Sequence, residues 1–118
     1  MSHSDDSVRL HHILDAARKA QAILNGRSLE ELAHDEIGNL ALERLLEIIG
    51  EAANRVGPST MAGLGELPWR DMIDMRNVII HAYPDVELET VWRTVVEDLP
   101  SLVDTLGRYL EDVQGDVT

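Results

Sequence analysis

The sequence predicts an all-α fold, a single-domain helical bundle of four to five helices. Apolar residues recur at helical spacing along most of the chain, and no stretch alternates apolar and polar residues for long enough to indicate a sheet. Hydrophobic residues make up 44% of the chain and Phe is absent, so the core must be built from Leu, Ile, Val, Ala and Met, which suits packed helices. The 118 residues are enough for one domain, and we expect residues 1–118 to form it, with 1–5 flexible.

The first predicted helix runs from Asp6 to Asn25. Ser4 or Asp5 is a suitable N-cap, and Gly26 is a suitable stop. The stretch Ser28 to Glu31 then resembles a capping box, because the Ser hydroxyl and the Glu carboxylate can each accept a hydrogen bond from a free amide of the first turn. It predicts a short helical turn that leads into a longer element.

The central predicted helix runs from Asp35 to Val56 with a broad apolar stripe. Residues 57–67 contain three Gly and one Pro and predict an ordered connecting loop. Pro68 suits the first turn of a third main helix, which Tyr83-Pro84 ends because the residue before a proline is disfavoured in the helical region.

The last predicted helix begins after Asp85, a candidate cap, and continues in helical spacing from Leu88 through Leu110. Pro100 interrupts this stripe. Its ring removes one backbone hydrogen bond and costs about 3 kcal/mol unless packing compensates, so the sequence predicts a kink there.

Composition excludes several classes of function. The absence of Cys removes disulfides, thiolate metal sites and Cys nucleophiles, and no run approaches the ~20 apolar residues that span a bilayer. We therefore expect a soluble cytoplasmic protein with no membrane contact. With 22 acidic and 10 basic residues the net charge is −12, so nucleic-acid contact must be local and a basic partner protein is plausible.

The stretch Arg76-Asn77-Val78-Ile79-Ile80-His81-Ala82-Tyr83 carries most of the functional information. It places a permanent cation, an amide, an imidazole and a phenol beside an apolar core segment. At about 100° of rotation per residue, Asn77 and His81 lie one above the other on a helix and Arg76 lies to one side. One arc of the helix then carries all three polar side chains.

Arg76, His81 and Tyr83 match the R-x4-H-x-Y signature, and the chain resembles the HepT-like toxins of the HEPN superfamily, the partners of MNT-type minimal nucleotidyltransferases. Three further stretches resemble the same family in the expected order, namely Leu46 to Ala53, Leu67 to Arg70, and Val91-Trp92 with Asp98-Leu99-Pro100. A bare R-x4-H pair would be weak evidence, since such pairs recur by chance in many helices.

The resemblance implies a HEPN-like homodimer, part of a type VII-like toxin–antitoxin system, with metal-independent endoribonuclease activity and no cofactor. It implies that Arg76 and His81 are catalytic at a cleft shared by two subunits, and that the nucleotidyltransferase antitoxin inactivates the toxin by transferring AMP to Tyr83. Asn77 occupies a position that the family commonly fills with a polar residue, and we expect it to position the reacting groups.

These residue types suit RNA cleavage without a metal. A histidine with a reference pKa near 6.5 serves as acid or base at neutral pH, but one His81 cannot do both at once. A two-fold dimer supplies a second imidazole, and two Arg76 guanidiniums can hold the phosphate.

Structural explanations compete with this assignment. Arg76 alone is more often an ion-pair partner, here of Asp71 or Asp74, and His81 alone is favoured by the dipole at a helix C-terminus. The row Glu43, Glu47 and Glu51 most often means a solvated helix face.

Glu51 could instead support the site. Gly50 permits close approach of a second helix, and the neighbouring carboxylate could orient Arg76 or Arg70 at the interface. The single Glu-x-x-His element at Glu31 and His34 is too little for a di-iron site, so no metal site is expected.

Two other functions stay open. The chain can be a non-catalytic binding partner or regulator of a minimal nucleotidyltransferase, which the net charge of −12 favours. It can also be a structural helical dimer with no chemistry. A neighbouring reading frame for a nucleotidyltransferase would support the ribonuclease toxin and the non-catalytic partner. Growth arrest on expression that Arg76→Ala or His81→Ala abolishes would separate these two.

Overall fold

The computed structural model describes residues 3–82 and 87–117, and for 3–4, 78–82 and 114–117 it describes the backbone alone. The part so described is helical and contains no strand, which confirms the all-α prediction. In chain order the elements are α1 (His3–Leu24), α2 (Leu29–Ala33), α3 (Glu36–Asn54), α4 (Pro58–Gly63), α5 (Trp69–Ala82), α6 (Leu88–Arg93), the π-helical segment η1 (Thr94–Asp98) and α7 (Leu99–Val117).

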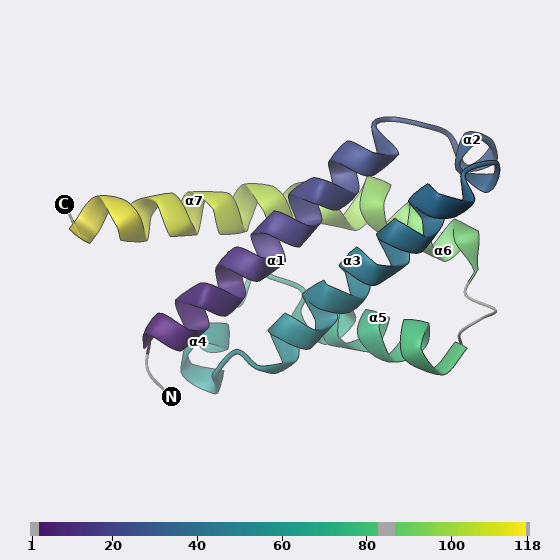
Figure 1. Ribbon diagram of the computed structural model, residues 1–118. Coiled ribbons are helices and arrows are strands. Elements are labelled where there is room, and N and C mark those ends of the chain that lie inside the picture. The colour runs from purple at the N-terminus through teal and green to yellow at the C-terminus, as the bar shows by residue number, and fades with distance from the viewer. Residues whose placement is uncertain (1–2, 83–86, 118) are drawn as a thin grey trace.

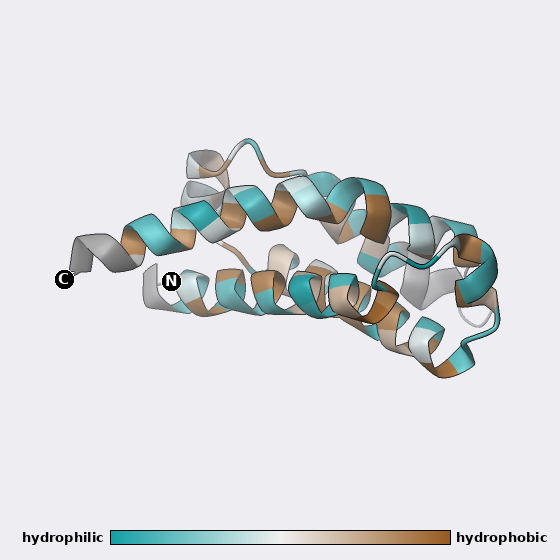
Figure 2. Ribbon diagram, turned by 90° about the horizontal axis from the view of Figure 1, so that it is seen from above, coloured by the Kyte–Doolittle hydropathy of each residue, from teal (hydrophilic) through white to brown (hydrophobic). Residues whose placement is uncertain are grey.

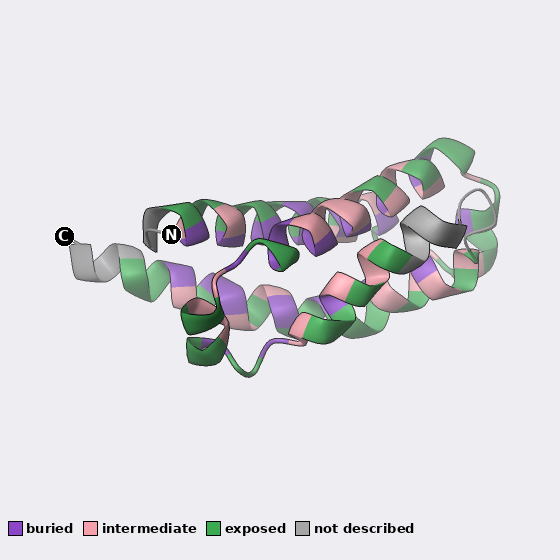
Figure 3. Cartoon of the chain, turned by 90° about the horizontal axis from the view of Figure 1, so that it is seen from below, coloured by how far each residue is buried: buried purple, intermediate pink, exposed green. Residues whose placement is uncertain are grey.

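Helix α3 lies at the centre of the bundle, with α1 packed along one side and α5 along another (Figure 1). Helix α7 crosses behind α1 and closes the core. Hydrophobic residues of the long helices face the interior (Figure 2), and the same faces are buried (Figure 3). The largest fully buried side chains are Leu10, Ile13, Leu32, Leu42, Leu46, Leu102, Leu106 and Val91, each contributing on the order of 2 kcal/mol relative to an exposed position.

The first helix begins earlier than the sequence indicated. Because α1 starts at His3, Ser4 and Asp5 lie within its first turn and do not cap it from outside. Asp6, which is buried, instead acts across the bundle. Its Oδ1 accepts a hydrogen bond from the Gly57 amide at 3.2 Å, and its Oδ2 accepts one from the Thr60 hydroxyl at 2.7 Å.

These contacts bear on a second difference from the sequence prediction, which concerns residues 57–67. The predicted loop at 57–67 contains the short helix α4, with Pro58 in its first turn and Gly57 as its N-cap. Gly57 provides no side-chain cap, and the carboxylate of Asp6, 51 positions away, instead anchors the start of α4 by accepting from the Gly57 amide and the Thr60 hydroxyl. Sequence-local patterns do not reveal such a distant contact.

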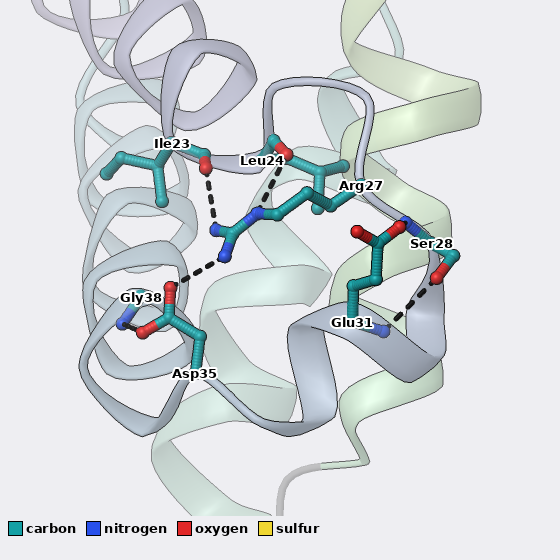
Figure 4. A network of polar contacts seen from close by, with 7 residues as sticks. All are labelled: Ile23, Leu24, Arg27, Ser28, Glu31, Asp35 and Gly38. Carbon is teal, nitrogen blue, oxygen red and sulfur yellow. Dashed lines mark hydrogen bonds and ion pairs between the residues drawn. The ribbon is translucent and has the colours of Figure 1, made fainter.

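A polar corner joins the end of α1 to α2 and α3 (Figure 4). The Arg27 guanidinium donates to the carbonyls of Ile23 and Leu24 at 2.8 and 3.2 Å, and its Nη1 contacts Asp35 Oδ2 at 2.8 Å. Asp35 is also the N-cap of α3 and accepts from the Gly38 amide at 2.8 Å. One arginine therefore terminates one helix and holds the cap of another.

The predicted capping box is confirmed in the same corner. Ser28 Oγ accepts from the Glu31 amide, and Glu31 Oε1 accepts from the Ser28 amide, both at 3.1 Å. The indole of Trp92 in α6 donates to the Arg27 carbonyl at 2.9 Å and ties α6 to this corner.

The predicted irregularity at Pro100 takes the form of a π-helical segment. Pro100 lies in the first turn of α7, directly after η1, and the Leu99 amide donates to the Thr94 carbonyl five residues before it. Proline supplies no amide and its ring crowds the carbonyl four residues earlier, so a wider turn accommodates it. The predicted cap Asp85 lies outside the described residues, and Glu87 precedes α6 without a side-chain cap.

None of the helices in the described part of the chain is both long enough and apolar enough to cross a membrane.

Candidate functional site

Gly50 lets α5 approach α3 at Arg76. A Cβ built on Gly50 would collide with the Arg76 Cβ and would lie 2.9 Å from the Met72 carbonyl oxygen and 3.1 Å from the Arg76 Cα. Real Cβ atoms essentially never come within 3.0 Å of such neighbours. The missing side chain at Gly50 therefore places the backbone of Arg76 directly against the central helix, as the sequence predicted.

Arg76 is half-buried, and its Nε is buried without a hydrogen-bond partner in the described structure. Its Nη1 reaches the Asn77 Oδ1 at 3.5 Å, the upper limit for a hydrogen bond. A buried guanidinium nitrogen with no acceptor costs free energy, on the order of 1–3 kcal/mol. The described side chains supply no acceptor for this nitrogen.

The ion-pair explanation for Arg76 is not supported. Among the described side chains, neither Asp71 nor Asp74 has an oxygen within 4.0 Å of its guanidinium nitrogens. The guanidinium charge is therefore not neutralised by a carboxylate of the same described chain.

Glu51 does not reach either predicted arginine within one copy of the chain. Its carboxylate lies 3.9 Å from Arg44 Nη1, which pairs more closely with Glu47 at 3.0 Å. The predicted contact with Arg76 or Arg70 is therefore absent within a single chain.

Asn77 and His81 lie one turn apart on α5, and His81 belongs to the final turn of that helix. Asn77 is exposed, whereas the side chain of His81 is not among those described. Tyr83 lies outside the described residues. The backbone of α5 thus places Arg76, Asn77 and His81 in the register that the sequence predicted, and their joint side-chain geometry stays a prediction.

The spacing of the glutamates along α3 did not indicate that Glu43 differs from its neighbours. Partial burial raises the pKa of Glu43, so the row of glutamates on α3 is not the uniformly solvated face that its spacing predicted. Helices α3 and α5 run antiparallel, and Gly50 lies opposite the turn from Met72 to Arg76. Glu43, two turns earlier on α3, is therefore level with the last turn of α5, which contains His81. The partial burial of Glu43 could be identified only from the tertiary packing of the helices.

Comparison with known proteins identifies the family of the chain. The sequence model of the HepT-like family, described as ribonuclease HepT-like, matches residues 13–108. The chain belongs to the HepT-like ribonuclease family. Among its HepT-like relatives, a protein of Thermococcus cleftensis named "Probable ribonuclease HepT" is 37% identical over 101 residues, covering 86% of this chain and 89% of the relative.

A second HepT-like relative, from Caldanaerobacter subterraneus, is named only as a candidate RNase. It is 31% identical over 102 residues, covering 86% of this chain and 91% of the relative. No solved structure matches the chain. The resemblance first noted at Arg76, His81 and Tyr83 is therefore confirmed at the level of the family.

Proposed function

We propose that this chain is the toxin of a HEPN/MNT toxin–antitoxin pair and cleaves RNA internally, without a metal, in the cytoplasm. The observation that carries the proposal is the half-buried guanidinium of Arg76, held against Gly50 without a carboxylate partner in the described chain and on the same helix as His81. A phosphodiester supplies the acceptor that this cation lacks.

The proposed reaction divides proton transfer between two copies of His81. One imidazole removes the proton from the ribose 2′-hydroxyl as the 2′-oxygen attacks phosphorus. The bond from phosphorus to the 5′-oxygen breaks, and His81 of the partner subunit protonates that leaving oxygen. The Arg76 guanidinium stabilises the charge on the phosphorane, and the products are a 2′,3′-cyclic phosphate and a 5′-hydroxyl. Asn77 is proposed to position these groups.

The exposed face of α3 supports the proposed dimer. Ile37 is 82% exposed and Leu40 49% exposed, and the half-buried Ile48 lies on the same arc. Single exposed apolar residues are ordinary, but a row of them along one helix favours a partner surface. The double variant Ile37→Lys/Leu40→Lys should convert a dimer into a monomer in light scattering, whereas Val113→Lys on α7 should not.

The test of cleavage compares matched variants on the purified chain with labelled RNA in the presence of EDTA. Arg76→Ala and His81→Ala should each lower the cleavage rate by at least about 100-fold. Arg70→Ala on the same helix and His34→Ala after α2 should leave the rate within about twofold, because exposed residues away from the site contribute little. Cleavage by His81→Ala at the parental rate would refute the mechanism.

Inactivation is proposed to occur at Tyr83. The phenol oxygen attacks the α-phosphorus of ATP in the active site of the nucleotidyltransferase, pyrophosphate leaves, and the phenol proton is lost. The anionic AMP group would then repel RNA and block the site. With the partner enzyme, Mg²⁺ and ATP, mass spectrometry should show one or more added AMP units on the parent and on Tyr109→Phe, but none on Tyr83→Phe.

A second function, that of a non-catalytic partner or regulator of the nucleotidyltransferase, is favoured by the net charge of −12. It predicts AMP transfer without RNA cleavage by the unmodified protein. The cleavage assay and the mass measurement together therefore distinguish the two functions.

A further inference from the structure

An apolar groove lies between α5 on one side and η1 with the start of α7 on the other. Its volume is about 460 Å³. The apolar side chains that line it are Leu46, Ile49, Pro68, Met72, Met75, Leu99 and Leu102. Leu46 and Ile49 belong to α3, so the central helix forms the floor of the groove.

The groove follows from the way the helices pair. Helix α5 packs along α3, whereas α7 packs along α1, and in the described residues α5 makes no extensive contact with α7. The space between them has no helix of this chain to fill it. Methionines such as Met75, which is half-buried, suit a surface that adapts to a partner because the thioether side chain is flexible.

The rim of the groove is acidic. Glu66, Asp71, Glu97 and Asp98 line it, and no Lys or Arg does so in the part of the chain that is described. None of the four carboxylates forms an ion pair with a described side chain. Burial, followed by the neighbouring charges of Glu97 and Asp71, raises the pKa of Asp98. Repulsion among these carboxylates would be relieved by a cation.

The acidic residues of the rim indicate which kind of molecule can bind in the groove. RNA phosphates would meet four carboxylates, and the proposed dimer already uses a different surface, the exposed face of α3 with Ile37 and Leu40. We propose that the groove binds a basic amphipathic segment of a partner protein, whose apolar side chains cover Met72 and Met75 and whose Lys or Arg side chains contact the acidic rim.

This surface is separate from the proposed cleavage site. Neither Arg76 nor Asn77 lines the groove. Met75 and Asn77 are two positions apart on α5, a rotation of about 200°, so they lie on opposite sides of the helix, whereas Met72 lies one turn before Arg76. A partner seated in the groove would leave the face with Asn77 uncovered. Binding in the groove therefore does not depend on whether the chain cleaves RNA, and the two proposals can fail independently.

The test uses a fluorescent synthetic helical peptide with leucines on one face and lysines on the other, titrated with the purified full chain at fixed salt. The groove variant is Asp71→Asn/Glu97→Gln/Asp98→Asn. The control, Glu30→Gln/Glu111→Gln/Asp112→Asn, changes the net charge equally at exposed positions outside the groove. The groove variant should weaken peptide binding about tenfold, since three exposed charge contacts of a few tenths of a kcal/mol sum to about 1.4 kcal/mol. The control should change it less than about twofold.

Met75→Glu separates the groove from simple charge attraction. It adds a negative charge, so it would strengthen binding that depends on charge alone, whereas loss of the apolar contact in the groove should weaken it. The proposal is overturned if the parent does not bind the peptide, if the two triple variants lose affinity equally, or if Met75→Glu binds as tightly as the parent. It is also overturned if the groove variant changes the oligomeric state but not peptide binding, because the occupant would then be a second copy of the chain.

Discussion

Two arginines show how differently the two sides of this bundle use charge. The Arg27 guanidinium donates to the carbonyls of Ile23 and Leu24 and pairs with Asp35 at 2.8 Å (Figure 4). Among the described residues, the buried Nε of Arg76 has no acceptor, and its guanidinium makes one hydrogen bond, at 3.5 Å, to its neighbour Asn77. The first arginine holds helices together, whereas the second is held in place by packing and keeps its hydrogen-bonding capacity unused.

The carboxylates divide in the same way. The amide of Gly38, and after it Arg27, lowers the pKa of Asp35. Burial, and after it Glu97 and Asp71, raises the pKa of Asp98. The corner at Arg27 is therefore electrostatically satisfied, and the α5 side of the molecule carries charge that its own described residues do not neutralise. In this chain, charged groups that neighbouring groups neutralise stabilise the fold, whereas charged groups without a described partner identify the candidate functional surfaces.

The largest effect on stability is expected at the contact between α3 and α5. Gly50→Val should lower the free energy of unfolding by about 3 kcal/mol, because the new side chain collides with Arg76 and with the Met72 carbonyl. Gly63→Val, which meets nothing within 4 Å, should change it by less than about 0.5 kcal/mol. Urea unfolding of both variants measures this difference, and equal stability would mean that α5 does not pack closely at Gly50.

A smaller loss is expected in the satisfied corner. Arg27→Ala should lower the free energy of unfolding by about 1–2 kcal/mol, because its contacts to two helix-end carbonyls and to Asp35 disappear. RNA cleavage at a temperature well below the unfolding midpoint should be unchanged. A variant as stable as the parent would show that the network in Figure 4 does not support the fold.

The smallest effects concern pH and have opposite signs. The folded pKa of Asp35 is lowered, so its stabilisation is present above the ordinary carboxyl pKa and is lost as pH falls through the lowered value. The folded pKa of Asp98 is raised, so its cost is present above that raised value and disappears as pH falls below the ordinary one.

At pH 7, Asp35→Asn should therefore lower the urea midpoint, and Asp98→Asn should raise it slightly. Both differences from the parent should shrink as the pH is lowered toward the carboxyl range. Urea unfolding curves at a series of pH values, from 7 down to the lowest pH at which the parent stays folded, check this. Changes in the urea midpoint that have the same sign for both variants at pH 7 would contradict the contrast between the two carboxylates.

Features coded by local sequence were predictable. The Ser28–Glu31 capping box depends on residues three positions apart and lies where the sequence placed it. The central helix begins one residue after the predicted start, with Asp35 as its N-cap. The close approach at Gly50 also followed from a single missing side chain. Pro100 indicated an irregular helix, although its chemistry alone did not specify a π turn before it.

Features that depend on distant contacts were not predictable. The start of α4 is held by hydrogen bonds to Asp6 of α1. The partial burial that raises the pKa of Glu43 depends on tertiary packing rather than on the spacing of glutamates along α3. The acidic groove combines residues of α5 with Glu97 and Asp98 of η1, which are remote in sequence. Spacing along one helix predicts which residues share a face of that helix, but it does not predict which other element packs against that face.

The most direct test of this account measures RNA cleavage and the free energy of unfolding on the same preparations of Arg76→Ala and Arg27→Ala. Arg76→Ala should lose at least about 100-fold in cleavage and should not lose stability as Arg27→Ala does, because removing the guanidinium also removes the cost of its buried, unpaired Nε. Arg27→Ala should lose stability and keep its cleavage rate. The reverse result, with Arg76→Ala unstable but active, would contradict the assignment of Arg76 to the reaction.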